Sequence, residues 1–375
     1  MKRKRIALHF SGVLTLYREI VEGMAAYLQH HPEWEIIWQG QNLFWLGPEV
    51  WSCGADAVIC GPLRKEEVSE IRRFKGKVIC VSNFRREERV LAVVNDDREV
   101  GRTAGRHLSG LGFRQLAFVN SSNSYFAEER LAGAREILEE RPGSRLQSFS
   151  VPDLLKLAPV LDEILKVFDP PFAIYCDTDM AAVKLAETAF HRGFRIPEDA
   201  ALLGTDNSPL LCQFCRPRLS SVALDARRIG MRIGALLEEL PEKGGVPPRR
   251  IEIPPLGVEA RRSTDITALE DRRVARALEI LRARKGRDLT VEQLAREAGM
   301  SRRLLEVKFK ETLHRTPYQE MLRLRVEHAR DLLRRTDWTI GRVAEETGFQ
   351  DIRTFNRTFL SEVGLPPREF RKGPS

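Results

Sequence analysis

The sequence predicts two kinds of fold in one chain: two lobes, each an α/β doubly wound parallel sheet, followed by an all-α domain with two helix-turn-helix motifs. Three observations support this prediction. Short β-branched runs alternate with helical stretches from Ile6 to Leu240, as in parallel sheets covered by helices. One helical phrase then occurs twice between Leu289 and Phe370. Residues 271–375 hold 24 of the 61 Lys+Arg and 16 of the 53 Asp+Glu, so the whole net charge of +8 lies in this second part.

The α/β part begins with the basic segment Met1–Arg5 and an apolar run. This run contains His9 and lacks a small-residue cleavage site, so we interpret it as a first strand and not as a secretory signal. No apolar run approaches the roughly 20 residues of a membrane helix, and a cytoplasmic location without membrane contact is expected. The predicted strands are Ile6–Phe10, Ala57–Cys60, Lys77–Val81, Leu91–Val94, Leu116–Asn120, Phe172–Cys176, Ala201–Gly204 and Arg250–Ile253. The main predicted helices are Tyr17–His30, Glu99–Gly110, Ala127–Glu140, Met180–Arg192 and Ala226–Leu240.

Polar side chains follow most of these strands. Because parallel sheets bind ligands at the carboxyl ends of their strands, these positions are candidate ligand contacts. They are Ser11, Gly12, Ser82, Asn83, Asn95, Asp96, Asp97, Ser121–Ser124, Asp177, Asp206 and Asn207. Carboxylates and amides suit a polyhydroxylated ligand such as a sugar, which can stack on an aromatic side chain; the aromatic candidates are Trp38, Trp45, Phe84 and Tyr125. No nucleotide-binding glycine motif and no metal motif occurs, so neither a cofactor nor a metal is predicted.

Each candidate also has a purely structural alternative. Asp96 or Asp97 could cap the helix near Glu99, and Asp177 could cap the helix predicted from Met180. Arg130 could form a surface pair with Glu128 or Glu129. Asp206 is the firmest candidate, since no helix is predicted immediately after it. Cys212-Gln213-Phe214-Cys215 is a lone CxxC pair, which leaves a thiol- or metal-responsive protein as an alternative.

The repeated phrase has the features of a helix-turn-helix. Its copies are Leu289–Ser301 and Trp338–Gln350. In each copy a threonine can cap the first helix, and a glycine can supply the left-handed turn. A helix over Tyr318–Arg335 joins the copies, and Asp271–Arg284 forms a preceding amphipathic helix. Two such units in register predict a tandem reader of double-stranded DNA, against the alternative of an ordinary helical bundle.

Residues 289–370 resemble the AraC-type transcription factor domain. The α/β part resembles the effector-binding core of LacI-type regulators, which are similar to periplasmic sugar-binding proteins. Four blocks carry this second resemblance: Asp96–Gly101, Glu129–Gly133, Cys176–Ala181 and Leu203–Asn207. The resemblance implies that Arg130, Asp177 and Asp206 contact a sugar effector, and it favours a pentose such as xylose. Asp96, Asn207 and Ser124 complete the predicted effector set. The chain departs from ordinary LacI-type regulators at its start, where the small DNA-binding headpiece is replaced by the AraC-type segment.

The two recognition helices are expected to bury one face each. In the first, Leu304, Leu305 and Phe309 form the predicted buried stripe; in the second, it consists of Ile352, Phe355, Phe359 and Val363. Resemblance to AraC-type members places Arg303, Glu306 and Val307 toward bases in the first helix. Lys310 is expected to contact a phosphate, with a solvated charge without a role as the alternative. In the second helix, Arg353 and Arg357 face bases and Asn356 points outward.

The predicted domains are residues 1–262 for effector binding, 263–270 as a linker and 271–375 for DNA binding. Together they predict a sugar-controlled transcription regulator, acting as an activator and as a homodimer, with RNA polymerase as a further partner. The alternatives are a sugar-acting enzyme with an appended DNA-binding domain and the thiol- or metal-responsive regulator.

Overall fold

A computed structural model of the chain describes residues 4–10, 15–37, 48–62, 71, 73–83, 90–151, 153–154, 157–240, 247–265, 272–313, 315–363 and 365–372. The chain divides into two compact units, Met1–Ile266 and Thr267–Ser375. Within the described residues, no helix combines the length and the apolar character needed to cross a bilayer.

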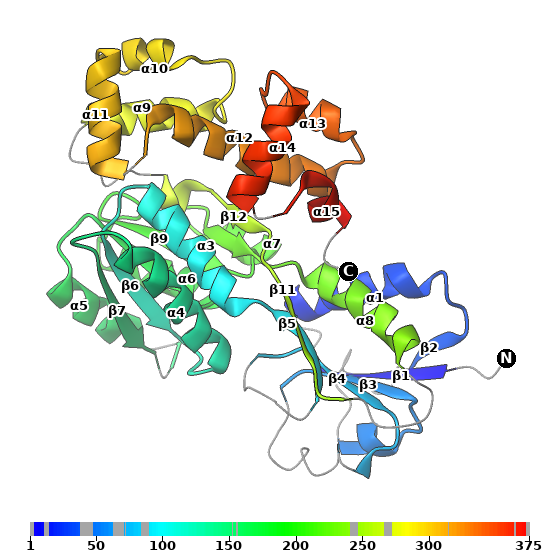
Figure 1. Ribbon diagram of the computed structural model, residues 1–375. Coiled ribbons are helices and arrows are strands. Elements are labelled where there is room, and N and C mark those ends of the chain that lie inside the picture. The colour runs from blue at the N-terminus through cyan, green and yellow to red at the C-terminus, as the bar shows by residue number, and fades with distance from the viewer. Residues whose placement is uncertain are drawn as a thin grey trace. The chain divides into compact units, whose positions relative to one another are not determined.

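The first lobe of the first unit is built on a parallel sheet with strand order β11-β5-β4-β3-β1-β2 (Figure 1). Its strands are β1 (Lys4–His9), β2 (Trp34–Ile37), β3 (Ala57–Cys60), β4 (Lys77–Cys80), β5 (Leu91–Asn95) and β11 (Arg250–Ile253). The helices α1 (Thr15–Leu28) and α8 (Ala226–Glu239) pack together on one face, and the 3-10 helix η1 (Pro48–Ser52) contributes Val50 to the core on the other. Strands β3 and β4 are wholly buried, as expected for strands covered on both faces.

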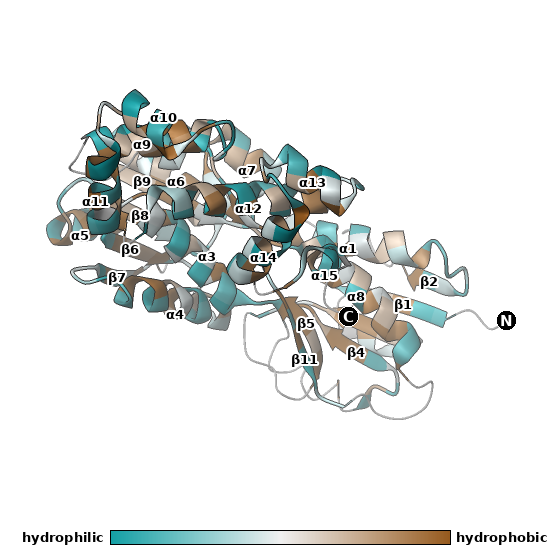
Figure 2. Ribbon diagram, turned by 45° about the horizontal axis from the view of Figure 1, so that its top comes forward, coloured by the Kyte–Doolittle hydropathy of each residue, from teal (hydrophilic) through white to brown (hydrophobic). Residues whose placement is uncertain are grey.

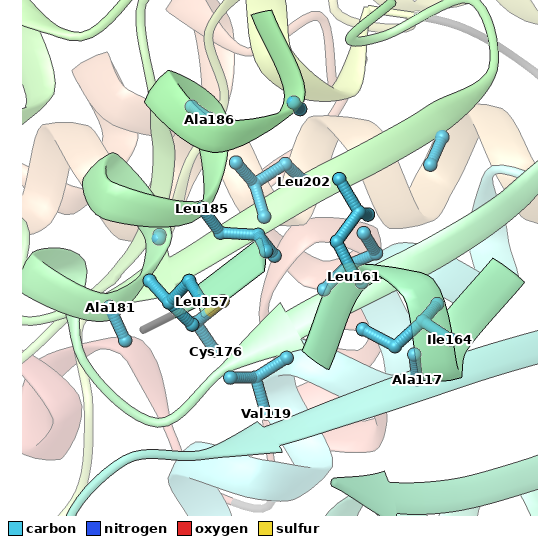
Figure 3. Packing of buried hydrophobic residues seen from close by; sticks show 14 of the residues in the cluster. Ala117, Val119, Leu157, Leu161, Ile164, Cys176, Ala181, Leu185, Ala186 and Leu202 are labelled. Atoms are coloured by element: carbon cyan, nitrogen blue, oxygen red, sulfur yellow. The ribbon is translucent and has the colours of Figure 1, made fainter. Parts of the chain in front are cut away.

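The second lobe contains a sheet of order β12-β10-β9-β8-β6-β7, in which β12 alone runs antiparallel to its neighbour. Its strands are β6 (Gln115–Asn120), β7 (Arg145–Ser150), β8 (Phe172–Cys176), β9 (Ala200–Thr205), β10 (Ser220–Ala223) and β12 (Gly257–Glu259). Its helices are α3 (Asp97–Gly110), α4 (Tyr125–Glu139), α5 (Leu157–Val167), α6 (Asp179–His191) and α7 (Pro209–Phe214). Figure 3 shows part of the core in which side chains of α5 and α6 meet β6, β8 and β9. The two-lobed fold class is therefore confirmed, although β2, β7, β10, β12 and α5 were not predicted.

Each lobe holds one pair of helices in unusually close contact, and glycines allow it. A Cβ atom on Gly101 of α3 would lie 2.0 Å from the Arg130 carbonyl oxygen of α4. In the other lobe, a Cβ atom on Gly23 of α1 would lie 1.9 Å from the Arg227 carbonyl oxygen of α8. Only glycine tolerates these approaches, so the same packing device is used twice.

The first unit extends further along the chain than the predicted boundary at residue 262. Strand β12 pairs with β10, and the 3-10 helix η2 (Arg262–Thr264) buries Ser263 and Thr264. The Ser263 hydroxyl accepts a bond from the Ser220 amide and donates to the Leu202 carbonyl oxygen. The first residues of the segment predicted as a linker are thus ordered parts of the second lobe. Residues 266–271 lie outside the described residues.

The second unit consists of α9 (Arg272–Ala283), α10 (Val291–Glu297), α11 (Arg302–Leu313), α12 (Pro317–Arg335), α13 (Ile340–Glu346), α14 (Ile352–Val363) and α15 (Pro367–Lys372). Thr290 caps α10 within a capping box, and Thr339 caps α13. The turn glycines Gly299 and Gly348 have φ values of 72° and 80°, so both predicted left-handed turns are confirmed. Figure 2 shows brown, hydrophobic strands in the first unit and helices with alternating teal and brown faces in the second.

The prediction that Ile352 is buried in its recognition helix is wrong. Leu305, Phe309, Phe355 and Phe359 are fully buried, but Ile352 is 46% exposed. Ile352 starts α14, and the first turn of a helix extends past the core that Phe355 and Phe359 occupy. Periodicity alone does not reveal where along a helix its packing partner ends.

Candidate functional sites

A cluster of charged side chains is buried near the carboxyl ends of β8 and β9. At its centre is Arg130 of α4, which is 3% exposed. Its Nε and Nη2 atoms each lie 2.8 Å from Asp97 Oδ1, and its Nη1 atom donates to the main-chain oxygen of Asp177. The guanidinium also lies over the Phe126 ring, 4.7 Å from its centroid. The alternative of a surface pair between Arg130 and Glu128 or Glu129 is therefore wrong.

Asp177 lies on the same cluster and has no capping role. The cap of α6 is Thr178, whose hydroxyl accepts from the Ala181 amide. The fully buried Asp177 carboxylate instead accepts from the Ser121 amide at 2.9 Å and from the Ser121 and Ser122 hydroxyls at 2.6 and 2.9 Å. These bonds hold the loop after β6 against the end of β8, which brings strand-end polar groups together.

Asp206 follows β9 in a strained conformation. Its φ is 113° and that of Asn207 is 53°, values that side-chain-bearing residues rarely adopt. The described residues provide no hydrogen bond to the Asp206 carboxylate. Burial and the negative charge of Asp179 raise the pKa of Asp206 well above its usual range. A helix does follow, contrary to the prediction, but the N-cap position of α7 is Ser208 and not Asp206.

Asp179 is a further aspartate of this cluster that the sequence did not predict as a contact. It is fully buried, and its carboxylate accepts from the Ser208 amide at 2.7 Å and the Ser221 hydroxyl at 2.6 Å. Burial raises the pKa of Asp179 to about 6. The available signal was a second aspartate two residues after Asp177, within one predicted block.

The remaining predicted effector residues already have partners. Asp96 caps α3 by accepting from the Glu99 amide at 2.9 Å, so its capping alternative is confirmed. Ser124 caps α4, and its hydroxyl lies 2.7 Å from that of Ser122. The Asn207 side-chain oxygen accepts from Arg261 at 2.8 Å. Each keeps free hydrogen-bonding capacity, but these contacts explain their positions without a ligand.

A small polar cavity of about 190 Å³ adjoins Asp97. It is lined by Asn83, Asp96, Asp97, Arg98, Arg102, Glu129, Arg250 and Glu252. Asn83 donates to Asp97 and accepts from Arg250, both at 2.5 Å, so the loop after β4 joins the Arg130 network. The predicted stacking residue Tyr125 lies under the Arg250 guanidinium. The other aromatic candidates, Trp38, Trp45 and Phe84, lie outside the described residues, as do the strand-end candidates Ser11 and Gly12.

The two CxxC thiols are unsuited to sensing. Cys212 is fully buried, and Cys215 is 4% exposed. Burial raises the pKa of the Cys212 thiol, and it raises the pKa of Cys215 to about 11. Protonated, buried thiols react slowly and bind metals poorly. In the described part of the chain, only His31, Glu33 and Glu238 are placed closely enough for a shared cation, and His31 already pairs with both carboxylates.

The second unit presents its predicted DNA-reading residues to solvent. On α11, Arg303, Val307 and Lys310 are exposed, while the partly buried Glu306 accepts from Arg302 at 2.8 Å. On α14, Arg353, Asn356 and Arg357 are exposed on the face opposite Phe355 and Phe359. A groove of about 460 Å³ runs beside α11, lined by Val291, Arg302, Glu306, Val307, Lys310, Thr316, Pro317 and Tyr318. The 19 residues of α12 span about 28 Å, close to the distance of roughly 34 Å between successive major grooves.

Comparisons with known proteins agree with this two-part organisation. Residues 106–264 match a family described as a periplasmic binding protein-like domain, and residues 294–373 match one described as a helix-turn-helix domain. The chain is 29% identical to the xylose operon regulatory protein of Escherichia coli strain K12, over 99% of this chain and 97% of that protein. It is 26% identical to the xylose operon regulatory protein of Haemophilus influenzae, over 98% of each chain.

A solved structure of the "xylose-binding transcription activator xylR" also matches, with 28% identity and a TM-score of 0.62. The match covers 99% of this chain and 98% of that one. These full-length relatives are regulators, which decides against the alternative of a sugar-acting enzyme. The chain is a transcription regulator that joins a periplasmic binding protein-like domain to an AraC-type helix-turn-helix domain, and it resembles the xylose operon regulatory proteins along its whole length.

Proposed function

We propose that this regulator is controlled by a sugar, specifically a pentose such as xylose, and that it activates genes of sugar catabolism. The observation that carries the sugar assignment is the Asp206 carboxylate, which is held by strained backbone beside the Arg130 network without a hydrogen bond from the described residues. The names of the full-length relatives favour xylose over other sugars.

The chemistry of the cluster supports a neutral polyol. A carboxylate can accept bonds from two neighbouring hydroxyls, and charge-assisted bonds of this kind are each worth about 1.5–3 kcal/mol. Arg130 has five N–H groups, of which three are used by Asp97 and Asp177. The remaining two can donate to a ring oxygen or hydroxyl. Asp206, Asp177 and Arg130 are therefore proposed as the main effector contacts. Asp96, Asn207 and Ser124 are proposed as further contacts at the edge of the site.

A sugar bound by both lobes would control the protein by stabilising their closed arrangement. A direct contact between the lobes exists at Thr15 and Ser208, whose hydroxyl oxygens lie 3.1 Å apart. Binding shifts the balance between arrangements only by the difference in sugar affinity between them. Ser208 also donates its amide to Asp179, two residues from Asp177, so the contact is coupled to the proposed effector residues.

On the output side, we propose that Arg303, Glu306 and Val307 of α11 and Arg353, Asn356 and Arg357 of α14 read DNA bases, with Lys310 on a phosphate. Arginine can bond guanine O6 and N7 together, and glutamate can accept from cytosine N4. The regulator would act in the cytoplasm as a homodimer and contact RNA polymerase at activated promoters.

Calorimetric titration of the full chain with pentoses and hexoses tests the sugar assignment. DNA affinity measured with and without the sugar, on duplexes selected from a random library, tests its control of the output. We expect xylose to bind and to change DNA affinity. Binding of a hexose alone would reject the pentose, and the absence of any sugar effect on both measurements would reject the proposal.

A further inference from the structure

The described residues of the second unit form two separate apolar cores, one for each helix-turn-helix motif. The first is formed by α9, α10 and α11 with the start of α12, and the second by the rest of α12 with α13, α14 and α15. The long helix α12 contributes Met321 and Leu324 to the first core and Val326 and Ala329 to the second. The arrangement of the two recognition helices therefore depends on what fixes each motif to α12.

Arg325 lies on α12 between these two sets of core residues and contacts both motifs at once. Its Nε atom donates to the Gly286 carbonyl oxygen at 2.6 Å, in the loop between α9 and α10. Its Nη1 atom donates to the Gly348 carbonyl oxygen at 2.7 Å, in the turn between α13 and α14. One rigid, planar guanidinium thus bonds the main chain of the first motif and the turn of the second.

The backbone at both contacts is shaped to reach this side chain. Gly286 has a φ of +70°, and a Cβ atom on it would lie 2.5 Å from the Met321 carbonyl oxygen of α12. Gly348 has a φ of +80°, and a Cβ atom on it would lie 3.3 Å from Arg287 Cγ and 3.6 Å from Arg325 Nε. A side chain at either position would strain the backbone and push its carbonyl oxygen away from Arg325.

A second interaction, an ion pair, also joins the two motifs. Arg287 Nη1 lies 3.0 Å from Glu346 Oε1, joining the first motif to α13. These side chains are 30% and 44% exposed, and solvent-exposed ion pairs contribute little. Arg325 is partly buried and bonds main-chain oxygens, which have no rotamer freedom to lose. It is therefore the stronger of the two links.

We propose that Arg325 is a positioning residue that fixes the spacing and orientation of α11 relative to α14, and so selects one base-pair spacing between two DNA boxes. This inference rests on the proposed reading of DNA by both helices. It assigns to Arg325 no contact with DNA: the residue acts through the loop that precedes α10 and the turn that precedes the recognition helix α14.

The test uses the full chain and three variants, R325M, R325K and R342M. R325M removes both donors at similar side-chain length, while R325K keeps the charge but not the fork that spans two carbonyls. R342M is the matched control. It also removes one positive charge from the second unit, but Arg342 stacks on Trp338 within the second motif. Each protein is used to select duplexes from a random library, and affinities are then measured on a series with the box spacing changed by one base pair. Thermal melting verifies that each variant is folded.

We expect the wild-type chain and R342M to select two boxes at one spacing. R325M should select the same boxes, with its preference for that spacing reduced about tenfold, equivalent to about 1.4 kcal/mol. R325K should fall between them, and it decides the matter if R325M does not fold. An unchanged spacing preference in folded R325M or R325K would overturn the inference, as would loss of one box with the other retained. Failure of the wild-type chain to select any DNA would instead overturn the proposed DNA-reading function.

Discussion

Arg130 and Asp97 form a buried ion pair that joins α4 to the start of α3, with Arg130 Nε and Nη2 each 2.8 Å from Asp97 Oδ1. Their side chains are 4% and 2% exposed. A charge buried to this degree is stable only while its partner remains, so loss of either side chain alone should destabilise the second lobe irrespective of any effector.

Replacing Arg130 by Met should therefore destabilise the first unit by about 3–5 kcal/mol, because it leaves the Asp97 carboxylate buried and uncompensated. The R130M/D97L double variant should recover much of this loss. Scanning calorimetry of the full chain checks both. The control is R98M, which removes a 45% exposed arginine from its pairs with Glu129 and Glu136 and should change stability little. Equal losses in R98M and R130M would contradict the importance of burial.

Replacing Asp206 by Asn should weaken sugar binding without destabilising the protein. The described residues give its carboxylate no hydrogen bond to lose, and the substitution removes repulsion from Asp179. Isothermal titration with xylose measures the first effect, with a loss of about 1.5–3 kcal/mol or more for a charge-assisted bond. Glu187, an exposed carboxylate on α6, provides the control variant E187Q. Unchanged xylose affinity in D206N would remove Asp206 from the site.

The stability of the first unit should also depend on pH through Asp179 and Asp206. Burial is the chief cause of both shifts: it raises the pKa of Asp179 to about 6 and the pKa of Asp206 well above its usual range. In the unfolded chain both would titrate near pH 4 (about 3.9). Because a raised folded pKa favours protonation on folding, this stabilisation is complete below the unfolded pKa and is lost as pH rises through the folded pKa. D206N should consequently melt higher than the wild type at pH 7, and the difference should shrink as pH falls toward 4. A difference in melting temperature that grows on acidification would be inconsistent with these shifts.

Replacing Arg357 by Ala should lower specific DNA affinity by about 1–3 kcal/mol and relax base preference at one position, because an arginine–guanine contact would be lost. The comparison variant is K310A, whose lysine is proposed to contact a phosphate. It should weaken binding to all sequences alike and reduce the salt dependence of binding. Gel shifts on selected and scrambled duplexes distinguish the two patterns. If R357A binds both duplexes as the wild type does, Arg357 does not take part in base reading.

The local features of the DNA-binding part were predictable residue by residue. The capping box at Thr290 and the left-handed turns at Gly299 and Gly348 each depend on a few neighbouring residues. The buried stripe of Val274 and Leu278 likewise follows from helical periodicity. In the sensor part, the strands that alternate with helices were predicted, but short half-buried strands such as β7 and β12 carry too weak a pattern to be recognised.

Whether a strand-end residue caps a helix or joins a polar cluster could not be predicted in the same way. Asp96 and Asp97 are adjacent, yet one caps α3 and the other pairs with Arg130, 33 residues away. Asp177 leaves the capping of α6 to Thr178 because the serines after β6 hold its carboxylate. These outcomes depend on the packing of other strands and helices. That packing involves residues far away in the chain, so neighbouring residues alone do not predict it.

Composition, periodicity and turn residues were enough to predict that the chain joins a neutral α/β part to a basic tandem helix-turn-helix, because these are local properties. Three findings came from the folded structure alone: Arg130 is buried, Asp206 lies in strained backbone without a hydrogen bond from the described residues, and Arg325 bonds both motifs. Each of these depends on contacts between residues far apart in the chain. Such contacts form only when the sheets and helices have packed, since packing sets the burial that makes a charge costly to leave unpaired.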